Sequence, residues 1–197
     1  MARHVLTDIM GTTTHNDFVG ELTRYFESHV HPYASKTIVD ALKAGRLVPE
    51  YIGFMAVVTA KGYENGKLVP PFFEDVARNM RRWKQQDGSR IFSYSNGDAD
   101  EQRLMFRHSN LGDLTSLVDA HFGTDLFGMK NDPKSFRKVC KAIGAKPSEV
   151  VFLSDRSSEL DAASTAGMPV YMVVRPGNKE LEHPTYPVVT SFDQVKI

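Results

Sequence analysis

Residues 5–14 read Val-Leu-Thr-Asp-Ile-Met-Gly-Thr-Thr-Thr, a short apolar run that delivers a carboxylate into a turn rich in glycine and threonine. The leading valine and leucine suit a buried strand of a parallel sheet. Gly11, with Thr12 and the hydroxyl residues after it, suits a loop whose N–H and O–H groups bind an anion. A phosphate repels a carboxylate beside it, so the pattern makes chemical sense if a divalent cation lies between them and Asp8 is a nucleophile. A strand end with an Asx turn accounts for the same residues and stays open as an alternative.

The composition limits the classes of function. A chain of 197 residues suffices for one substantial domain with a small insertion. Lys and Arg together number 24, as do Asp and Glu, so the chain lacks the overall basic charge that nucleic-acid binding usually needs. No apolar run approaches the ~18 residues of a membrane span, and the N-terminus has no signal-like apolar stretch. We therefore expect a cytoplasmic protein, monomeric or a small homo-oligomer, that binds neither nucleic acid nor membrane.

The single cysteine, Cys140, excludes an internal disulfide. It falls at helical core spacing in residues 136–143, which favours a packed thiol over a nucleophile. His29 and His31 invite a metal interpretation, but a spacing of two on a helix directs the side chains to different faces. We expect no histidine metal site there.

Strand-like runs alternate with helical periodicity along most of the chain. Residues 17–70 are the exception, because they look helical throughout, with helices expected at 18–26, 38–45 and 49–62, and Pro70-Pro71 closes them. After them we expect strands beginning at 91, 120, 149, 170 and 188, and helices over 72–86, 98–107, 133–143 and 158–166.

This alternation predicts an α/β fold, a Rossmann-like parallel sheet with helices on both faces and a small helical cap inserted after the first strand. The expected boundaries are residues 1–16 and 71–197 for the core and 17–70 for the cap. In such a sheet the carboxyl ends of the strands lie at one edge, where ligands bind. Asp8, Ser95 and Asp155 each follow a predicted strand directly, and Lys130 opens the loop after a fourth. We expect these four groups to converge.

Four short motifs resemble those of the haloacid dehalogenase-like phosphotransferases. They are Asp8-Ile9-Met10-Gly11-Thr12, the serine of Tyr94-Ser95-Asn96-Gly97, the lysine of Gly128-Met129-Lys130, and Ser154-Asp155 with Glu159. Residues flanking them, together with Val174-Arg175-Pro176-Gly177-Asn178, look like one branch, the bifunctional enolase-phosphatase of methionine salvage. The likeness runs from residue 3 to about 178 and is weakest through the helical insertion.

The resemblance implies a Mg²⁺-dependent phosphatase acting on a small phosphorylated metabolite. Asp8 would be the nucleophile that becomes an aspartyl phosphate. Asp8, Asp155 and the main-chain carbonyl of Met10 would hold Mg²⁺, with Glu159 steadying the metal shell. Ser95 and Asn96 would bind phosphoryl oxygens along with Thr12, and Lys130 would neutralise charge between phosphate and nucleophile. Phosphoryl transfer depends mainly on such positioning and neutralisation.

Two departures qualify this expectation. The family carries an acidic residue two positions after the nucleophile as general acid and base, and here a thioether, Met10, stands in its place. A positioned acid–base group is worth ~10²–10⁴ in rate, so the alternative is a catalytically impaired relative that binds phosphate or a phosphometabolite. The helical insertion is also shorter than the family's cap. A receiver-like phosphoryl acceptor also fits the strand-end residues, but the long insertion and the late Asp155 disfavour it.

Overall fold

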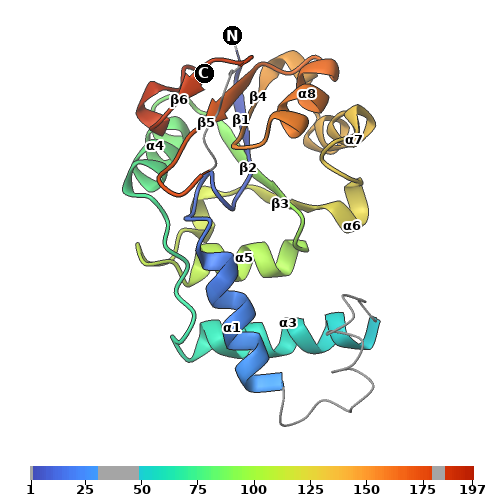
Figure 1. Cartoon of the computed structure of the whole chain (residues 1–197). Coiled ribbons are helices and arrows are strands. Elements are labelled where there is room, and N and C mark those ends of the chain that lie inside the picture. Colours follow the sequence, from blue (N-terminus) through green and yellow to red (C-terminus); the bar gives the residue numbers. More distant parts are fainter. Residues whose placement is uncertain (1, 31–48, 179–184) are drawn as a thin grey trace.

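A computed structural model describes residues 2–30, 49–178 and 185–197 of the chain (Figure 1). Its centre is a six-stranded sheet with the order β3-β2-β1-β4-β5-β6, in which every pair of neighbouring strands is parallel. The strands are β1 (His4–Thr7), β2 (Arg90–Ser95), β3 (Ala120–Gly123), β4 (Val150–Ser154), β5 (Val170–Val173) and β6 (Val188–Val189). The predicted parallel sheet is confirmed.

Helices cover both faces of this sheet, as the alternation predicted. The described helices are α1 (Phe18–Val30), α3 (Pro49–Glu64), α4 (Glu74–Gln85), α5 (Ala99–Arg107), α6 (Thr124–Phe127), α7 (Pro133–Ile143) and α8 (Ser157–Thr165). Short 3₁₀ turns lie at Thr115–Leu117, Pro147–Glu149 and Phe192–Gln194. The helix expected over 38–45 falls outside the described residues. Within them, no helix is long and apolar enough to cross a membrane.

The core has two halves because successive strand residues point to opposite faces of the sheet. Val5 packs with α4 and α5, whereas the next residue, Leu6, packs with α7 and α8. Trp83 lies in the first half with 0% of its surface exposed. Cys140 lies in the second half as a buried free thiol, as its helical spacing predicted.

The helices of the described part of the insertion are α1 and α3, which cross each other beyond the carboxyl edge of the sheet, and α3 packs against α5 (Figure 1). Phe18 and Tyr63, from these two helices, are almost fully buried and join the core half that contains α4 and α5. The two linkers of the insertion pair with each other, since Thr14 forms an antiparallel bridge with Phe72. No strand lies within 17–30 or 49–70.

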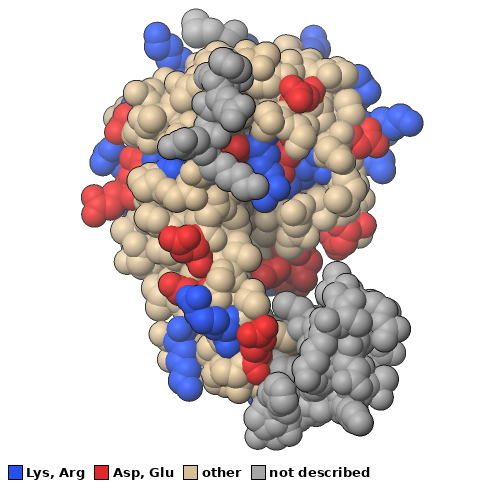
Figure 2. Space-filling view, viewed as in Figure 1, with Lys and Arg blue, Asp and Glu red and all other residues tan. Residues whose placement is uncertain are grey.

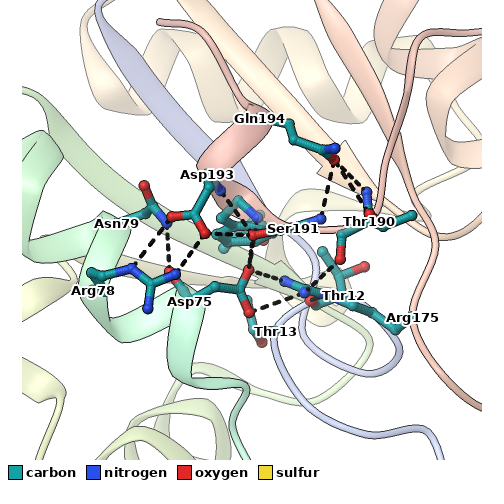
Figure 3. A network of polar contacts seen from close by, with 12 residues as sticks. Thr12, Thr13, Asp75, Arg78, Asn79, Arg175, Thr190, Ser191, Asp193 and Gln194 are labelled. Atoms are coloured by element: carbon teal, nitrogen blue, oxygen red, sulfur yellow. Dashed lines mark hydrogen bonds and ion pairs between the residues drawn. The ribbon is translucent and has the colours of Figure 1, made fainter.

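A buried arginine ties the first loop to two distant segments (Figure 3). The guanidinium of Arg175 donates to both carboxylate oxygens of Asp75 at 3.0 and 2.8 Å. It also donates to the carbonyls of Thr12 at 3.1 Å and Thr190 at 3.0 Å. Its carbon Cζ lies 4.4 Å from the centre of the Phe73 ring, a cation–π distance. The loop after β1, the start of α4 and the C-terminal segment are therefore held by one side chain that is 5% exposed.

We predict that Arg175→Met destabilises the fold by about 3–5 kcal/mol, because it leaves the Asp75 carboxylate and two carbonyls without their donor. Urea unfolding measures the loss. The double variant with Asp75→Asn should be more stable than the single variant, since it removes the uncompensated charge. The exposed pair of Arg78 and Asp193 is the control, and Arg78→Met should cost far less. Equal losses for the two arginine variants would contradict this account.

Candidate active site

The strand ends bring the predicted site residues to one edge of the sheet. β1 lies between β2 and β4 in matched register, with Thr7 opposite both Ser93 and Leu153. Asp8 follows β1 directly, and its N–H continues the ladder by donating to the Leu153 carbonyl at 2.9 Å. Because the strands are parallel, Asp8, Ser95 at the end of β2 and the residue after β4 all face the same carboxyl edge.

Asp8, Lys130 and Glu159 form a buried charged group at this edge. Each is at most 5% exposed. The Lys130 ammonium contacts Oδ1 of Asp8 and lies 3.1 Å from Oε1 of Glu159. Oε2 of Glu159 accepts from the Ser154 hydroxyl at 2.8 Å. Both oxygens of Glu159 therefore accept from protein donors. Through these contacts Glu159 positions the Lys130 ammonium.

The charges in this group perturb one another. Burial alone would lower the pKa of Lys130, but the carboxylates of Asp8 and Glu159 outweigh it and raise the pKa. Lys130 is therefore a fixed cation at neutral pH. Burial, and then the charge of Asp8, raise the pKa of Glu159. Oδ2 of Asp8 is the less engaged of its two oxygens, with a contact of 3.4 Å from the Thr12 hydroxyl.

Asp155 has too few positive or donor partners for a carboxylate in its position. It is half-buried, Oδ2 accepts from the Asn16 side chain at 3.3 Å, and Oδ1 is buried without a hydrogen-bond partner. Burial raises its pKa, and the nearby charge of Asp8 raises it further. Such an orphaned oxygen beside a second carboxylate fits a hard divalent cation.

The described residues contain no group of three or more His, Cys, Asp or Glu side chains arranged to hold a metal ion. A Mg²⁺ ion needs fewer protein carboxylates than that, because it commonly keeps several waters and takes one or two carboxylates. Asp8 and Asp155, with a main-chain carbonyl, are a sufficient protein contribution for such an ion.

The turn after β1 differs from the expected anion loop in one respect. The N–H groups of Thr12, Thr13 and Thr14 donate to the Ile9 carbonyl at 3.2, 2.9 and 3.0 Å. They therefore stabilise the turn and are not free for an anion, whereas the Thr12 hydroxyl does face Asp8. Gly11 has φ +76°, and a Cβ there would lie 2.4 Å from Oδ2 of Asp155, so only glycine fits.

Met10 lies half-buried in this turn, and its sulfur accepts a 3.4 Å contact from the Thr14 hydroxyl. A thioether has no proton to give or take near neutral pH. The position two residues after Asp8 thus offers no acid or base.

The turn at residues 95–97 is held from behind by Gln102, which is 1% exposed. Its amide donates to the carbonyls of Gly97 at 2.9 Å and Phe122 at 2.8 Å. Its oxygen accepts from the Ser93 hydroxyl at 2.6 Å. Ser95 is half-buried and Asn96 exposed, and the side chain of Asp98 caps α5 by accepting from the N–H of Glu101. The predicted polar turn at a helix N-terminus is confirmed.

Two asparagines join the first and last motifs. Asn178 donates to the Gly11 carbonyl at 3.0 Å, and its oxygen accepts from Asn16 at 3.1 Å. Asn16 also donates to Asp155, so the chain from 174 to 178 supports the Asp155 side of the site. Sequence reasoning missed Asn16 and Gln102, because a single amide in a loop or helix gives no periodic or motif signal.

Comparison with known proteins agrees with this geometry. The sequence model of the haloacid dehalogenase-like hydrolases matches residues 2–167. Enolase-phosphatase E1 of Anopheles gambiae is 30% identical, over 98% of this chain and 82% of the relative. Enolase-phosphatase E1 of Thioalkalivibrio sulfidiphilus is 33% identical, with all of both chains covered.

Solved structures share the fold. The crystal structure of the UTR4 protein of Saccharomyces cerevisiae superposes with a TM-score of 0.88 at 28% identity, covering 99% of this chain and 100% of the other. CbbY of Rhodobacter sphaeroides, solved with phosphate, superposes with a TM-score of 0.73 at 14% identity, covering 98% of this chain and 96% of the other. At that identity the likeness concerns the fold alone.

We predict that Asp155→Asn stabilises the metal-free protein by about 0.5–2 kcal/mol, the usual range for a single stabilising substitution. The pKa of Asp155 is raised on folding, so its ionised form destabilises the native state once the pH exceeds that raised pKa. Thermal unfolding in a chelator at pH 7 measures the gain.

Millimolar Mg²⁺ should raise the unfolding midpoint of the wild type and leave that of Asp155→Asn unchanged. Asp125→Asn, which removes an exposed carboxylate of α6, is the control and should keep the Mg²⁺ response. A Mg²⁺ response that survives in Asp155→Asn would refute the metal assignment.

Proposed function

The chain belongs to the haloacid dehalogenase-like hydrolase family, and on that basis we propose that it is a Mg²⁺-dependent phosphatase that acts on a small phosphorylated metabolite. The observation that carries the proposal is the buried group of Asp8, Lys130 and Glu159 beside the unpaired oxygen of Asp155. Relatives named enolase-phosphatase E1 support the enolase-phosphatase reaction of methionine salvage as the specific activity.

In the proposed reaction, a carboxylate oxygen of Asp8 forms a bond to phosphorus as the ester P–O bond breaks, and the leaving oxygen takes a proton from water and departs as the alcohol. Water then cleaves the aspartyl phosphate, which releases inorganic phosphate and restores the carboxylate. Lys130, fixed by Glu159, offsets the charge that gathers between nucleophile and phosphoryl group. Its raised pKa supports this role, because the ammonium stays charged throughout.

The metal proposal assigns Asp8, Asp155 and the main-chain carbonyl of Met10 as the protein ligands. A bound Mg²⁺ would neutralise phosphoryl oxygens and relieve the repulsion between substrate and the two carboxylates. We propose that Glu159 steadies this centre through Lys130. For the phosphoryl oxygens we propose the hydroxyls of Ser95 and Thr12 with the amide of Asn96.

We also propose that residues 17–70 act as a cap on a core formed by 1–16 and 71–197. The pairing of the two linkers supports these boundaries: the Phe73 N–H donates to the Thr13 carbonyl at 3.1 Å, and the His15 N–H to the Pro71 carbonyl at 3.3 Å. Linkers that pair in this way give the insertion one narrow junction with the core. A narrow junction suits a unit that closes over substrate.

Met10 favours a second candidate, a relative that binds a phosphorylated metabolite without releasing phosphate. The two candidates share the binding site and differ in proton transfer alone. Substrates with poor leaving groups need protonation as the P–O bond breaks, and the thioether of Met10 cannot supply the proton. Activated aryl phosphates need less protonation of the leaving group. Comparing alkyl with aryl esters therefore distinguishes the phosphatase from the binding protein.

We predict that Met10→Glu raises the rate of phosphate release from alkyl phosphates by ~10²-fold or more, with a smaller gain on aryl phosphates. A released-phosphate assay with Mg²⁺ on matched alkyl and aryl esters measures both. Asp8→Asn should abolish release from either class. If Met10→Glu changes neither class and Asp8→Asn leaves any residual rate untouched, the phosphatase proposal fails and the binding-protein candidate replaces it.

A further inference from the structure

A chain of three hydrogen-bonded side chains runs behind the turn after β2, from His121 of β3 through Ser93 of β2 to Gln102 of α5. The Ser93 hydroxyl lies 2.6 Å from Nδ1 of His121 and 2.6 Å from Oε1 of Gln102. Ser93 is 0% exposed and Gln102 is 1% exposed. His121 is half-buried, and its ring centre lies 5.3 Å from that of Phe106. The chain therefore links a strand at the edge of the sheet to the turn proposed for the phosphoryl group.

The partners of each side chain fix where its protons lie. The Gln102 amide nitrogen donates to the carbonyls of Gly97 at 2.9 Å and Phe122 at 2.8 Å. Its oxygen therefore faces Ser93. An amide oxygen only accepts, and a hydroxyl has one proton to donate. Ser93 thus donates to Gln102 and accepts from a proton on Nδ1 of His121. The reverse direction would leave the Gln102 oxygen buried without a donor, at a cost in free energy.

The surroundings of His121 keep its ring uncharged. Burial, and then the charge of Arg103, lower the pKa of His121 to about 4. At neutral pH the ring therefore carries one proton, and the contact with Ser93 places it on Nδ1. The hydrogen bonds accordingly keep one direction near neutral pH, from His121 toward Gln102.

Both carbonyls of the turn are held by donors from this side. The Gln102 amide holds the carbonyl of Gly97. The Thr124 hydroxyl, at the start of α6, donates to the carbonyl of Asn96 at 3.2 Å. In a planar trans peptide the N–H points opposite to the C=O, so the N–H groups of Gly97 and Asp98 are directed away from these two donors. In the part of the chain that the structure describes, neither N–H donates to another protein group.

The first turn of α5 supplies negative rather than positive charge. Asp100 and Glu101 follow the cap residue Asp98. Figure 2 shows acidic side chains gathered at the level of α5, in the hollow between the core and the helices beyond it. Such charges repel a phosphoryl group at short range. At this turn the attraction therefore has to come from the side chains of Ser95 and Asn96 and from main-chain N–H groups, whose direction the carbonyl contacts fix.

We propose that His121 is a positioning residue for the phosphoryl site. Through Ser93 and Gln102 it holds the Gly97 carbonyl in place. The N–H groups of Gly97 and Asp98 are thereby directed to the phosphoryl oxygens. Donors fixed in this way need no reorganisation when charge gathers on the phosphoryl group. The proposal rests on the proposed phosphatase function, because it uses the same turn for the phosphoryl group.

Titration calorimetry with inorganic phosphate in millimolar Mg²⁺ tests the positioning role, with the thermal midpoint of each variant measured alongside. His121→Phe keeps a ring in place but removes the Nδ1–H, and we expect phosphate to bind about threefold to tenfold more weakly. His121→Asn keeps an N–H that can reach Ser93 but leaves a space where the ring was. It should lower the thermal midpoint more than His121→Phe does, while phosphate affinity stays near that of the wild type.

Ser93→Ala breaks the same chain at its middle and should weaken phosphate binding by the same factor. Combined with His121→Phe it should add little further loss, because either substitution alone interrupts the chain. His4→Phe is the control, since His4 is also a half-buried strand histidine but lies at the amino edge of the sheet. It should leave phosphate affinity unchanged.

A purely structural role for His121 makes a different prediction. Phosphate affinity would then follow the thermal midpoint, and His121→Asn would be the weaker binder of the two histidine variants. That order, or wild-type affinity in both His121→Phe and Ser93→Ala, would overturn the proposal. Absence of phosphate binding by the wild type would overturn it as well.

Amide NMR of the isotope-labelled protein tests the two main-chain donors directly. Phosphate should move the amide proton resonances of Gly97 and Asp98 downfield in the wild type, and should move them less in His121→Phe. The amide of Gly144, at the end of α7, is the internal reference and should not move. Unmoved resonances at Gly97 and Asp98 would contradict the assignment of the donors.

A separate assay keeps the two proposals distinct. Phosphate release from an aryl phosphate by the wild type reports the phosphatase function. Phosphate binding that depends on His121, without any release, would remove the phosphatase function and leave the positioning role standing. Release together with equal phosphate affinities in all variants would leave the phosphatase function standing and remove the positioning role.

Discussion

The balance of buried charge at the carboxyl edge of the sheet is the constraint on which the rest of the structure depends. The carboxylates of Asp8, Glu159 and Asp155 are opposed by the buried cation Lys130, and Arg156 acts on Asp155 from an exposed position, so the carboxylates outnumber the buried cation by two. Burying charge without an opposite partner costs free energy. The metal-free protein therefore stores an unfavourable interaction at the point where a divalent cation and a phosphoryl group would relieve it.

The supporting contacts come from distant parts of the chain and have one purpose in common. Arg175 fixes the turn after β1 by its carbonyl, Asn178 holds the same turn at Gly11, and Gln102 fixes the neighbouring turn after β2. These side chains are buried or half-buried, and each satisfies main-chain carbonyls. Rigid turns matter here because phosphoryl transfer depends on positioned charge more than on elaborate covalent chemistry.

The sequence was sufficient for the sheet, its helices and the convergence of Asp8, Lys130 and Asp155, because strand–helix alternation and parallel topology leave few arrangements. It was insufficient where contacts between distant residues decide which partner a polar group has. The Thr12–Thr14 amides looked free for an anion, but their donors turn inward to the Ile9 carbonyl. Gln102 belongs to no sequence motif, and its role follows only from the hydrogen bonds it makes behind β2 and β3. Glu159 shows its partner, Lys130, only in three dimensions.

Trapping the phosphorylated protein tests the proposed role of Asp8 most directly. The protein is mixed with Mg²⁺ and an aryl phosphate, quenched in acid, digested, and the peptide containing Asp8 is examined by tandem mass spectrometry. We predict one phosphoryl group on Asp8, at high occupancy because Met10 supplies no base for the hydrolytic water. Phosphate release with no phosphoryl group on Asp8, or with the group on a serine or threonine instead, would contradict the account.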